Sequence, residues 1–231
     1  MIVADLLQPL SLWLGWVLYA VILLWAVWRT PWVELFSDQR RQHLLFGTVL
    51  ALFLLWLVRR DFASGLSFHF IGMTAVTLLL DWPLALLGGF AAQLGLLAFG
   101  RQELAALGVN GLLLVAIPVA IAEFFAVQVE RRQPRNLFVY IFCCGFFPAA
   151  LTALVCLLGG LMLLWHDGLY VMPPWLEDFV GYLWLVMFPE AFINGMLVTG
   201  LVVFYPDWLE TFNRTRYLSA PWKDSDTDRR P

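Results

Sequence analysis

A few polar side chains stand inside long apolar stretches of the sequence, and their types could support chemistry. His69 lies in the stretch Ser-Phe-His-Phe-Ile-Gly-Met-Thr, where its imidazole could bind a metal ion or exchange a proton. Met73 follows four residues later, so in a helix its thioether would share a face with that imidazole. Groups of this kind are expensive to bury in a membrane unless they pair or face a cavity. The alternative is that the histidine is hydrogen-bonded at an interface and that the methionine only packs.

Glu190 and Asn194 form a second polar pair, four residues apart in Phe-Pro-Glu-Ala-Phe-Ile-Asn-Gly. In a helix they share a face, and no basic residue lies within an apolar stretch to pair with the carboxyl group. Glu190 therefore needs hydrogen-bonding partners, water or a cation. Alternatively, Pro189 marks a break at the membrane surface and leaves the carboxyl group at the interface. Asn110 opens another apolar stretch, where it could hydrogen-bond backbone groups across the bundle.

Neither the cysteines nor any catalytic motif indicates a specific chemical activity. Cys143, Cys144 and Cys156 lie in one apolar stretch, without the spacing of a zinc or thioredoxin site. We expect them to pack as small apolar residues, with ligation of a soft metal as the alternative. The sequence has no nucleophile elbow, phosphate loop, HExxH motif or paired catalytic carboxylates. We therefore expect no enzymatic activity, and an intramembrane enzyme using Glu190 and His69 is the weakest alternative.

The composition indicates which elements must position these residues. Of 231 residues, 61% are hydrophobic and 13% are charged, whereas a soluble domain is about 45–50% apolar and about 25% charged. These values exclude an ordinary soluble protein and also a disordered chain. With roughly 20 residues for each spanning helix, the length accommodates about six to eight spans. No room is left for a nucleotide-binding domain, so an ATPase that energises transport would be a separate chain.

Seven apolar segments are separated by charged or turn-rich residues, at 9–28, 43–58, 66–80, 84–99, 109–127, 137–165 and 179–204. Each is expected to be helical, because backbone groups in lipid must be satisfied within the segment. The sequence thus predicts an all-α integral membrane protein, a bundle of seven transmembrane helices. We expect one membrane domain at residues 1–204 and a polar tail at 205–231. The third and fourth helices meet at Asp81-Trp82-Pro83 as an antiparallel hairpin.

The distribution of basic residues orients the bundle. With seven spans, one set of flanks carries only Arg59, Arg60 and Arg101. The opposite set, which includes the tail, carries the others: Arg29, Arg40, Arg41, Arg131, Arg132, Arg135, Arg214, Arg216, Lys223, Arg229 and Arg230. We therefore predict an outside N-terminus and a cytoplasmic C-terminus, in the inner (plasma) membrane of the cell. The first segment lacks a preceding basic region and a small-residue cleavage site, so we expect it to be retained as a span.

The fourth segment carries small residues that permit close helix packing. Gly88, Ala92 and Gly95 accompany Gln93 along this segment. Helices can approach closely over such residues, so we expect this face to be a docking surface for a partner subunit.

Several short motifs follow one another in an informative order, namely Met1–Asp5, His69, Gly72, Thr74, Asp81-Trp82-Pro83, Leu107, Gly108, Asn110, Gly195–Thr199 and Tyr205–Trp208. Their order and spacing resemble those of the CbiM-type permeases, the substrate-capture subunits of energy-coupling-factor transporters for cobalt and nickel. The resemblance covers most of the chain. Seven spans with an outside N-terminus fit the same family.

The resemblance implies a metal site at the N-terminus. The family's site is similar to an amino-terminal clamp, in which the free amine, the amide and side chain of residue two and a histidine surround the ion. The matching groups here are the amine of Met1 and the imidazole of His69. Imidazole nitrogens suit cobalt and nickel, but residue two is Ile2, so one imidazole is missing. Met73, Asn110 or the thiols could replace it, which would favour softer ions such as copper(I).

The resemblance also implies partners. These are ATPase subunits and a transmembrane coupling subunit on separate chains, with a transition-metal ion as substrate and no covalently bound cofactor. The net charge of −3 is too small to suggest a nucleic-acid partner. We thus expect the substrate-binding component of a cobalt- or nickel-like uptake system. The alternative is a membrane assembly or chaperone protein that kept the fold and lost the metal site, and Ile2 is its main support.

Overall fold

The computed structural model describes residues 1–61, 67–168 and 183–218. In these ranges the chain is a helical bundle with one pair of two-residue strands. The first elements are η1 (Ala4–Leu6), α1 (Pro9–Arg29), α2 (Trp32–Ser37), α3 (Gln39–Leu57), β1 (Arg60–Asp61), β2 (Ser67–Phe68), α4 (Met73–Leu80) and α5 (Trp82–Ala98). The later elements are α6 (Leu104–Gly111), η2 (Leu112–Ala116), α7 (Ile117–Arg132), α8 (Leu137–Tyr140), η3 (Ile141–Phe146), α9 (Phe147–His166), α11 (Leu183–Phe204), η4 (Pro206–Trp208) and α12 (Arg214–Leu218).

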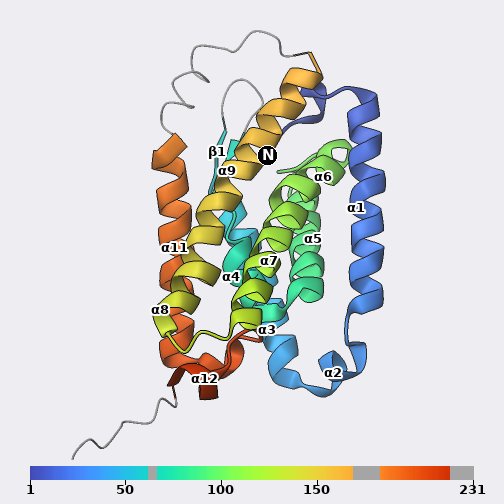
Figure 1. Cartoon of the computed structure of the whole chain (residues 1–231). Coiled ribbons are helices and arrows are strands. Elements are labelled where there is room, and N and C mark those ends of the chain that lie inside the picture. Colours follow the sequence, from blue (N-terminus) through green and yellow to red (C-terminus); the bar gives the residue numbers. More distant parts are fainter. Residues whose placement is uncertain (62–66, 169–182, 219–231) are drawn as a thin grey trace, which may run out of the picture.

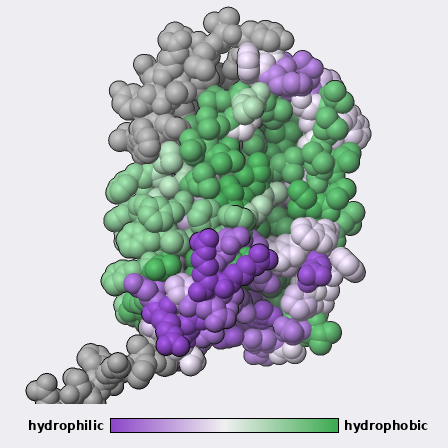
Figure 2. All heavy atoms as spheres, viewed as in Figure 1, coloured by the Kyte–Doolittle hydropathy of each residue, from purple (hydrophilic) through white to green (hydrophobic). Residues whose placement is uncertain are grey.

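Within the described ranges, four helices are long and apolar enough to cross a membrane: Pro9–Arg29, Leu104–Arg132, Leu137–His166 and Met187–Phe204. Large apolar side chains such as Trp13, Leu24 and Met162 are exposed on their outer faces. Figure 2 shows a broad apolar band above a strongly polar end of the molecule. A surface this apolar belongs in lipid, so the predicted all-α membrane class is confirmed. The seven-span count and the orientation remain predictions.

Two of the long helices contain a π-helical turn just before a proline. In the first, α6, η2 and α7 follow one another without a break, and Pro118 is the second residue of α7. In the second, α8, η3 and α9 do the same, and Pro148 is the second residue of α9. Proline lacks an N–H and crowds the carbonyl of the preceding turn, and a π turn rearranges the hydrogen bonds at such a point. Both helices therefore pass their proline uninterrupted.

The expectation of a continuous helix at residues 66–80 is wrong. Ser67–Phe68 is a strand that pairs antiparallel with β1, and the helix α4 begins only at Met73. Gly72 precedes it with a φ of 71°, in the left-handed region that glycine adopts without a Cβ clash. In α4 every residue except Leu79 is buried, and Figure 1 places this short helix in the middle of the bundle. The third segment is thus half strand and loop and half buried helix.

The small residues of α5 pack inside the chain. A side chain at Gly88 would contact Val49 of α3, and one at Gly95 would crowd Phe53 of the same helix. Ala92 is fully buried. The expected docking surface for a partner is therefore wrong, because α3 already covers this face.

Glycines also bring α1 and α6 close together. A Cβ at Gly108 would lie 2.6 Å from the backbone nitrogen of Trp16, and one at Gly15 would lie 2.9 Å from the backbone nitrogen of Val109. One turn further along α1, the Tyr19 hydroxyl donates to Gln93 Oε1 at 2.9 Å. The glycine contacts place α1 directly beside α6, and the Tyr19 hydrogen bond joins α1 to α5.

The segment after α11 folds back onto the polar end of the bundle. The rings of Phe212 and Tyr217 pack on Tyr140, with centroid distances of 5.0 and 5.5 Å. Arg216 donates to both carboxylate oxygens of Glu130, at 2.6 and 2.8 Å. The division into a domain at 1–204 and a tail at 205–231 stays a prediction. Three parts of the expected elements lie outside the described residues, namely residue 66 and the stretches 179–182 and 219–231.

Candidate metal-binding site

The first residue of the chain pairs with the strand that precedes His69. The Met1 amine donates a hydrogen bond to the Ser67 carbonyl at 2.7 Å, and the Ser67 N–H donates to the Met1 carbonyl at 2.9 Å. A reciprocal pair of this kind is the unit of an antiparallel ladder and sets the register between two segments. The amine is therefore held beside a residue that is only two positions from the imidazole.

Asn110, from α6, holds the second residue. The Ile2 N–H donates to its Oδ1 at 2.8 Å, and its Nδ2 donates to the Ile2 carbonyl at 2.9 Å. One side chain thus satisfies both main-chain groups of a buried residue. The Ile2 side chain, 6% exposed, packs with Leu7, Val109 and Leu164. The N–H of residue two is thus engaged in a hydrogen bond, and its hydrocarbon side chain carries no imidazole.

Asp167 anchors the segment where α1 begins. Its Oδ2 accepts from the Gln8 N–H at 2.9 Å, and its Oδ1 accepts from the Ser11 hydroxyl at 2.6 Å. Burial by itself would raise the pKa of Asp167, but hydrogen bonds from Ser11, His166 and Gln8 together lower it below its ordinary value. The start of the chain is therefore attached to the end of α9 as well as to β2 and α6.

His69 lies in the irregular segment between β2 and α4 and is 6% exposed. Its Nδ1 is 2.8 Å from the Phe70 carbonyl. Since a carbonyl only accepts, Nδ1 is the donor, and in the neutral ring the lone pair is then on Nε2, which is how a ligating imidazole is oriented. Trp56 packs on the imidazole with ring centroids 5.9 Å apart. The shared helix face predicted for His69 and Met73 is wrong, because α4 begins only at Met73.

The sulfur atoms near this segment lie in the apolar core. Met73 is fully buried in the main cluster, which Met1 contacts at its edge. Cys156 belongs to the same cluster, and its thiol donates to the Leu113 carbonyl at 2.7 Å. The other two cysteines belong to a second cluster. All three thiols are free, so the general expectation of small packing residues agrees with where they lie.

Two polar residues of α11 hold the start of α4. Glu190 accepts from the Ile71 N–H at 2.9 Å through Oε2 and from the Gly72 N–H at 2.8 Å through Oε1. Asn194 accepts from the Ala75 N–H at 3.0 Å and donates to Glu190 Oε1 at 2.9 Å. The two side chains therefore share a helix face, as predicted. At 3% exposure Glu190 is buried, so the alternative of an interfacial carboxyl group is wrong.

Comparison with known proteins agrees with this architecture. The family model CbiM, described as the cobalt uptake substrate-specific transmembrane region, matches residues 2–208. The chain belongs to the CbiM family. A solved structure titled "Crystal Structure of an Truncated Transition metal Transporter" superposes with a TM-score of 0.63 and 16% identity, over 87% of this chain and 98% of that chain. At this identity the likeness shows a common fold. Among curated proteins, none matches the chain.

Membership in the CbiM family makes the chain a membrane component of transition-metal uptake and confirms the resemblance noted from its motifs. In the part of this CbiM chain that the structure describes, no three His, Cys, Asp or Glu residues are grouped to hold a metal ion. The groups that the fold brings together are the amine of Met1 and the segment of His69. The side-chain amide of Asn110 uses both its oxygen and its nitrogen in hydrogen bonds to the main chain of Ile2. The ligand set remains a prediction.

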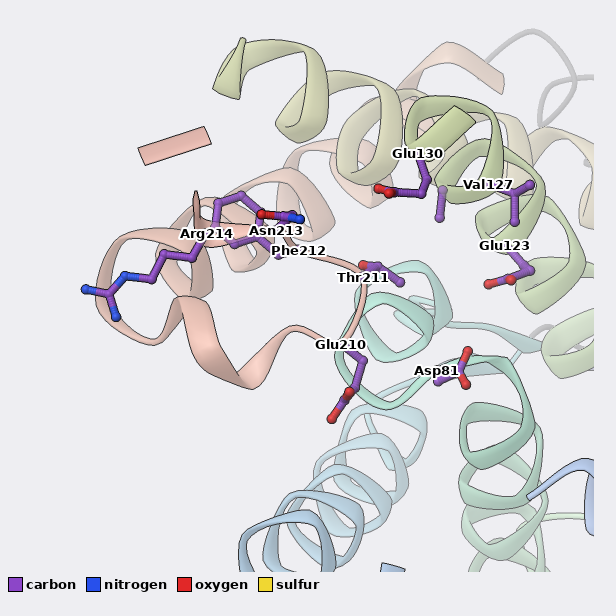
Figure 3. Close-up of a pocket in the computed structure, with 10 residues that line it drawn as sticks. Asp81, Glu123, Val127, Glu130, Glu210, Thr211, Phe212, Asn213 and Arg214 are labelled. Carbon is purple, nitrogen blue, oxygen red and sulfur yellow. The ribbon is translucent and has the colours of Figure 1, made fainter. Parts of the chain in front are cut away.

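A separate pocket of about 510 Å³ opens at the polar end of this CbiM chain. Figure 3 shows the carboxyl groups of Asp81, Glu123 and Glu130 around it. Burial raises the pKa of Asp81 above its ordinary value, while Glu130 is paired with Arg216. The pocket lies beside α12, at the opposite end of the bundle from the N-terminus (Figure 1). It is therefore distinct from the segment that carries His69.

Sequence reasoning missed two residues of the candidate site. Ser67 acts through its main-chain groups, and these have no signature in the sequence. Trp56 donates through Nε1 to the Ile71 carbonyl at 3.0 Å, although it lies within an apolar run that reads as lipid-facing helix. The run Ser-Phe-His-Phe-Ile before Gly72 alternates in the manner of an extended segment. That alternation was the available signal for a strand at this point.

Proposed function

We propose that the chain is the substrate-binding component of an energy-coupling-factor-type uptake system for a transition-metal ion. The CbiM family match over residues 2–208 supports this proposal. The described helices are accounted for by a single membrane bundle. Energy would therefore come from ATPase subunits and a transmembrane coupling subunit on separate chains, in the inner (plasma) membrane of the cell.

In this proposal the ion binds between the Met1 amine and the His69 imidazole. The observation that carries it is the reciprocal hydrogen bonding of Met1 with Ser67, which holds an amine nitrogen next to the histidine segment. The Met1 amine would lose a proton on binding. Nitrogen ligands suit cobalt and nickel. Sulfur from Met73 or Cys156 would shift the preference toward copper(I).

The proposed topology has seven crossings, with the N-terminus outside. The distribution of arginines supports this orientation. At the α12 end of the bundle, Arg41 forms an ion pair with Glu210, and Arg216 forms one with Glu130. Basic flanks of this kind favour the cytoplasmic side. The metal site would then face the outside, where an uptake protein meets its substrate.

A membrane assembly or chaperone protein is the second candidate function. It is favoured by Ile2, whose N–H donates to Asn110 and whose side chain fills an apolar cluster. A chain that had lost metal binding could keep these contacts for stability alone. Neighbouring genes discriminate the two functions, because transport requires genes for an ATPase and a coupling subunit.

Equilibrium dialysis of the purified protein against nickel, cobalt and copper(I) tests the proposal. We expect about one ion per chain for the wild type and for His43→Ala, a matched control at an exposed histidine. Binding should fall at least about tenfold in His69→Ala, since a first ligand contributes more than the outer partners of a metal site. Equal binding by wild type and His69→Ala would remove His69 as a ligand. A wild type that binds none of these ions would support the second candidate.

A further inference from the structure

We propose that Glu190 is a positioning residue of the metal site, which sets the conformation of residues 69–72 from the neighbouring helix α11. The proposal rests on the proposed function, because it takes His69 as the residue that binds the ion. Glu190 itself would not contact the ion. It acts on the backbone that presents the imidazole.

The hydrogen bonds of Glu190 go to backbone N–H groups just before α4. The N–H groups of Ile71 and Gly72 lie ahead of the first turn of α4, where a helix leaves its N–H groups without internal partners. Glu190 accepts from both, at 2.9 and 2.8 Å. Asn194 accepts from Ala75 in the same turn at 3.0 Å. A negative group at a helix N-terminus is also favoured by the helix dipole.

These bonds reach the imidazole through one intervening residue. Ile71 is separated from His69 only by Phe70, whose carbonyl lies 2.8 Å from the imidazole Nδ1. The Ile71 carbonyl accepts from Trp56 at 3.0 Å, and its N–H donates to Glu190. Both polar groups of this residue are therefore held, from α3 on one side and from α11 on the other. Losing one of the two anchors would let the Phe70 carbonyl, and with it the ring, change orientation.

The network requires a carboxylate, and an amide cannot replace it. Each of the three partners of Glu190 is a donor: the N–H groups of Ile71 and Gly72 and the Nδ2 of Asn194. A glutamine at this position has one oxygen and one NH₂ group. In either orientation the NH₂ group would face a backbone N–H, so at least one hydrogen bond becomes a repulsion.

The test compares Glu190→Gln with Thr199→Val, a matched control on the same helix. The Thr199 hydroxyl donates to the Gly195 carbonyl of its own helix, so its loss does not touch α4. Nickel and cobalt affinities are measured on the purified full chain. We expect affinity to weaken by about 10–100-fold in Glu190→Gln, the range found for outer partners of metal ligands, and to stay unchanged in Thr199→Val.

A second readout does not depend on metal binding. The chain has three histidines, so NMR of histidine-labelled protein without metal resolves the His69 imidazole by comparison with His69→Ala. In Glu190→Gln we expect the His69 signals to shift while those of His43 and His166 stay in place. A protein that is only globally destabilised would change all three or none.

Asn194→Ala provides a weaker variant in case Glu190→Gln does not fold. It removes the hydrogen bond from Asn194 Nδ2 to Glu190 Oε1 and leaves the two bonds from the backbone to Glu190. We therefore expect a smaller shift of the same His69 signals. The positioning role would be overturned if Glu190→Gln left both the metal affinity and the His69 signals unchanged. If only Asn194→Ala folds, unchanged His69 signals in that variant would overturn it. A wild type that binds no metal would instead refute the proposed function, and the NMR comparison would still decide the role of Glu190.

Discussion

The side-chain amide of Asn110 brackets the main chain of Ile2, accepting from its N–H at 2.8 Å and donating to its carbonyl at 2.9 Å. The two residues are separated by 108 positions, so the start of the chain is held by α6 and not by its own neighbours. Met1 is held in turn by Ser67. The position of the terminal amine is therefore a property of the assembled bundle.

Removing this bracket should loosen the N-terminal segment. Asn110→Ala leaves the N–H and carbonyl of Ile2 buried without partners, at a cost of about 1–3 kcal/mol for each group. We expect faster amide hydrogen exchange over residues 1–7, measured by mass spectrometry. Asn136→Ala is the control, because it removes an exposed helix cap that accepts from Phe138. Exchange at residues 1–7 that matches the wild type would show that Asn110 does not anchor the segment.

Close packing of α1 on α6 should make Gly108 intolerant of a side chain. In Gly108→Ala the new Cβ would lie 2.6 Å from backbone atoms of Trp16, which cannot move without shifting the helix. Overpacking of this kind costs about 1–3 kcal/mol, so the midpoint of thermal unfolding in detergent should fall. Gly47→Ala meets nothing within 4 Å and should be neutral or up to about 1 kcal/mol more stable. Equal midpoints for the two variants would contradict the close approach.

Acid should weaken the anchor at Asp167. Its pKa is lowered in the folded protein, so the carboxylate stabilises the fold above its unfolded pKa of about 4. That stabilisation is lost as the pH falls from there through the folded value. We expect the difference in thermal midpoint between wild type and Asp167→Asn to be constant from neutral pH to about 5 and to shrink below about 4. His166 lies 2.8 Å from the carboxylate and contributes to the lowered pKa, so both proteins should keep it. A difference that grows on acidification would reverse the assigned sign.

The helices that depend on local composition could be predicted from the sequence. The first span was expected at residues 9–28 and runs from Pro9 to Arg29, because Pro9 starts a helix well and Arg29 ends the apolar run. The hairpin at Asp81 was predicted for a similar reason. Its side chain accepts from the Trp82 N–H at 2.7 Å, and Pro83 fits the first turn of α5. In both cases the deciding residues lie within the element itself.

The candidate site could be predicted only in part, because distant residues assemble it. His69 and Glu190 stand out by their types, whereas Met1 is indicated only by the family resemblance. Their contacts join positions 66 and 119 apart, as in Met1 with Ser67 and Glu190 with Ile71, and periodicity reports only on near neighbours. The segment before Gly72 was expected to be helical because its composition is apolar. The N–H groups of Ile71 and Gly72 instead bond to a carboxylate that the local sequence does not contain.

The central claim is that the Met1 amine and the His69 imidazole bind one metal ion together. Calorimetric titration with nickel, cobalt and copper(I) tests this claim most directly. It compares the chain that begins at Met1 with the same chain carrying an added Gly-Ser before Met1. The extension turns the amine into an amide while leaving His69 in place. We expect the native chain to bind one ion and the extended chain to bind at least about 100-fold more weakly, a loss equivalent to about 2.7 kcal/mol. Equal affinities for the two chains would contradict the account, because the amine would then not be a ligand.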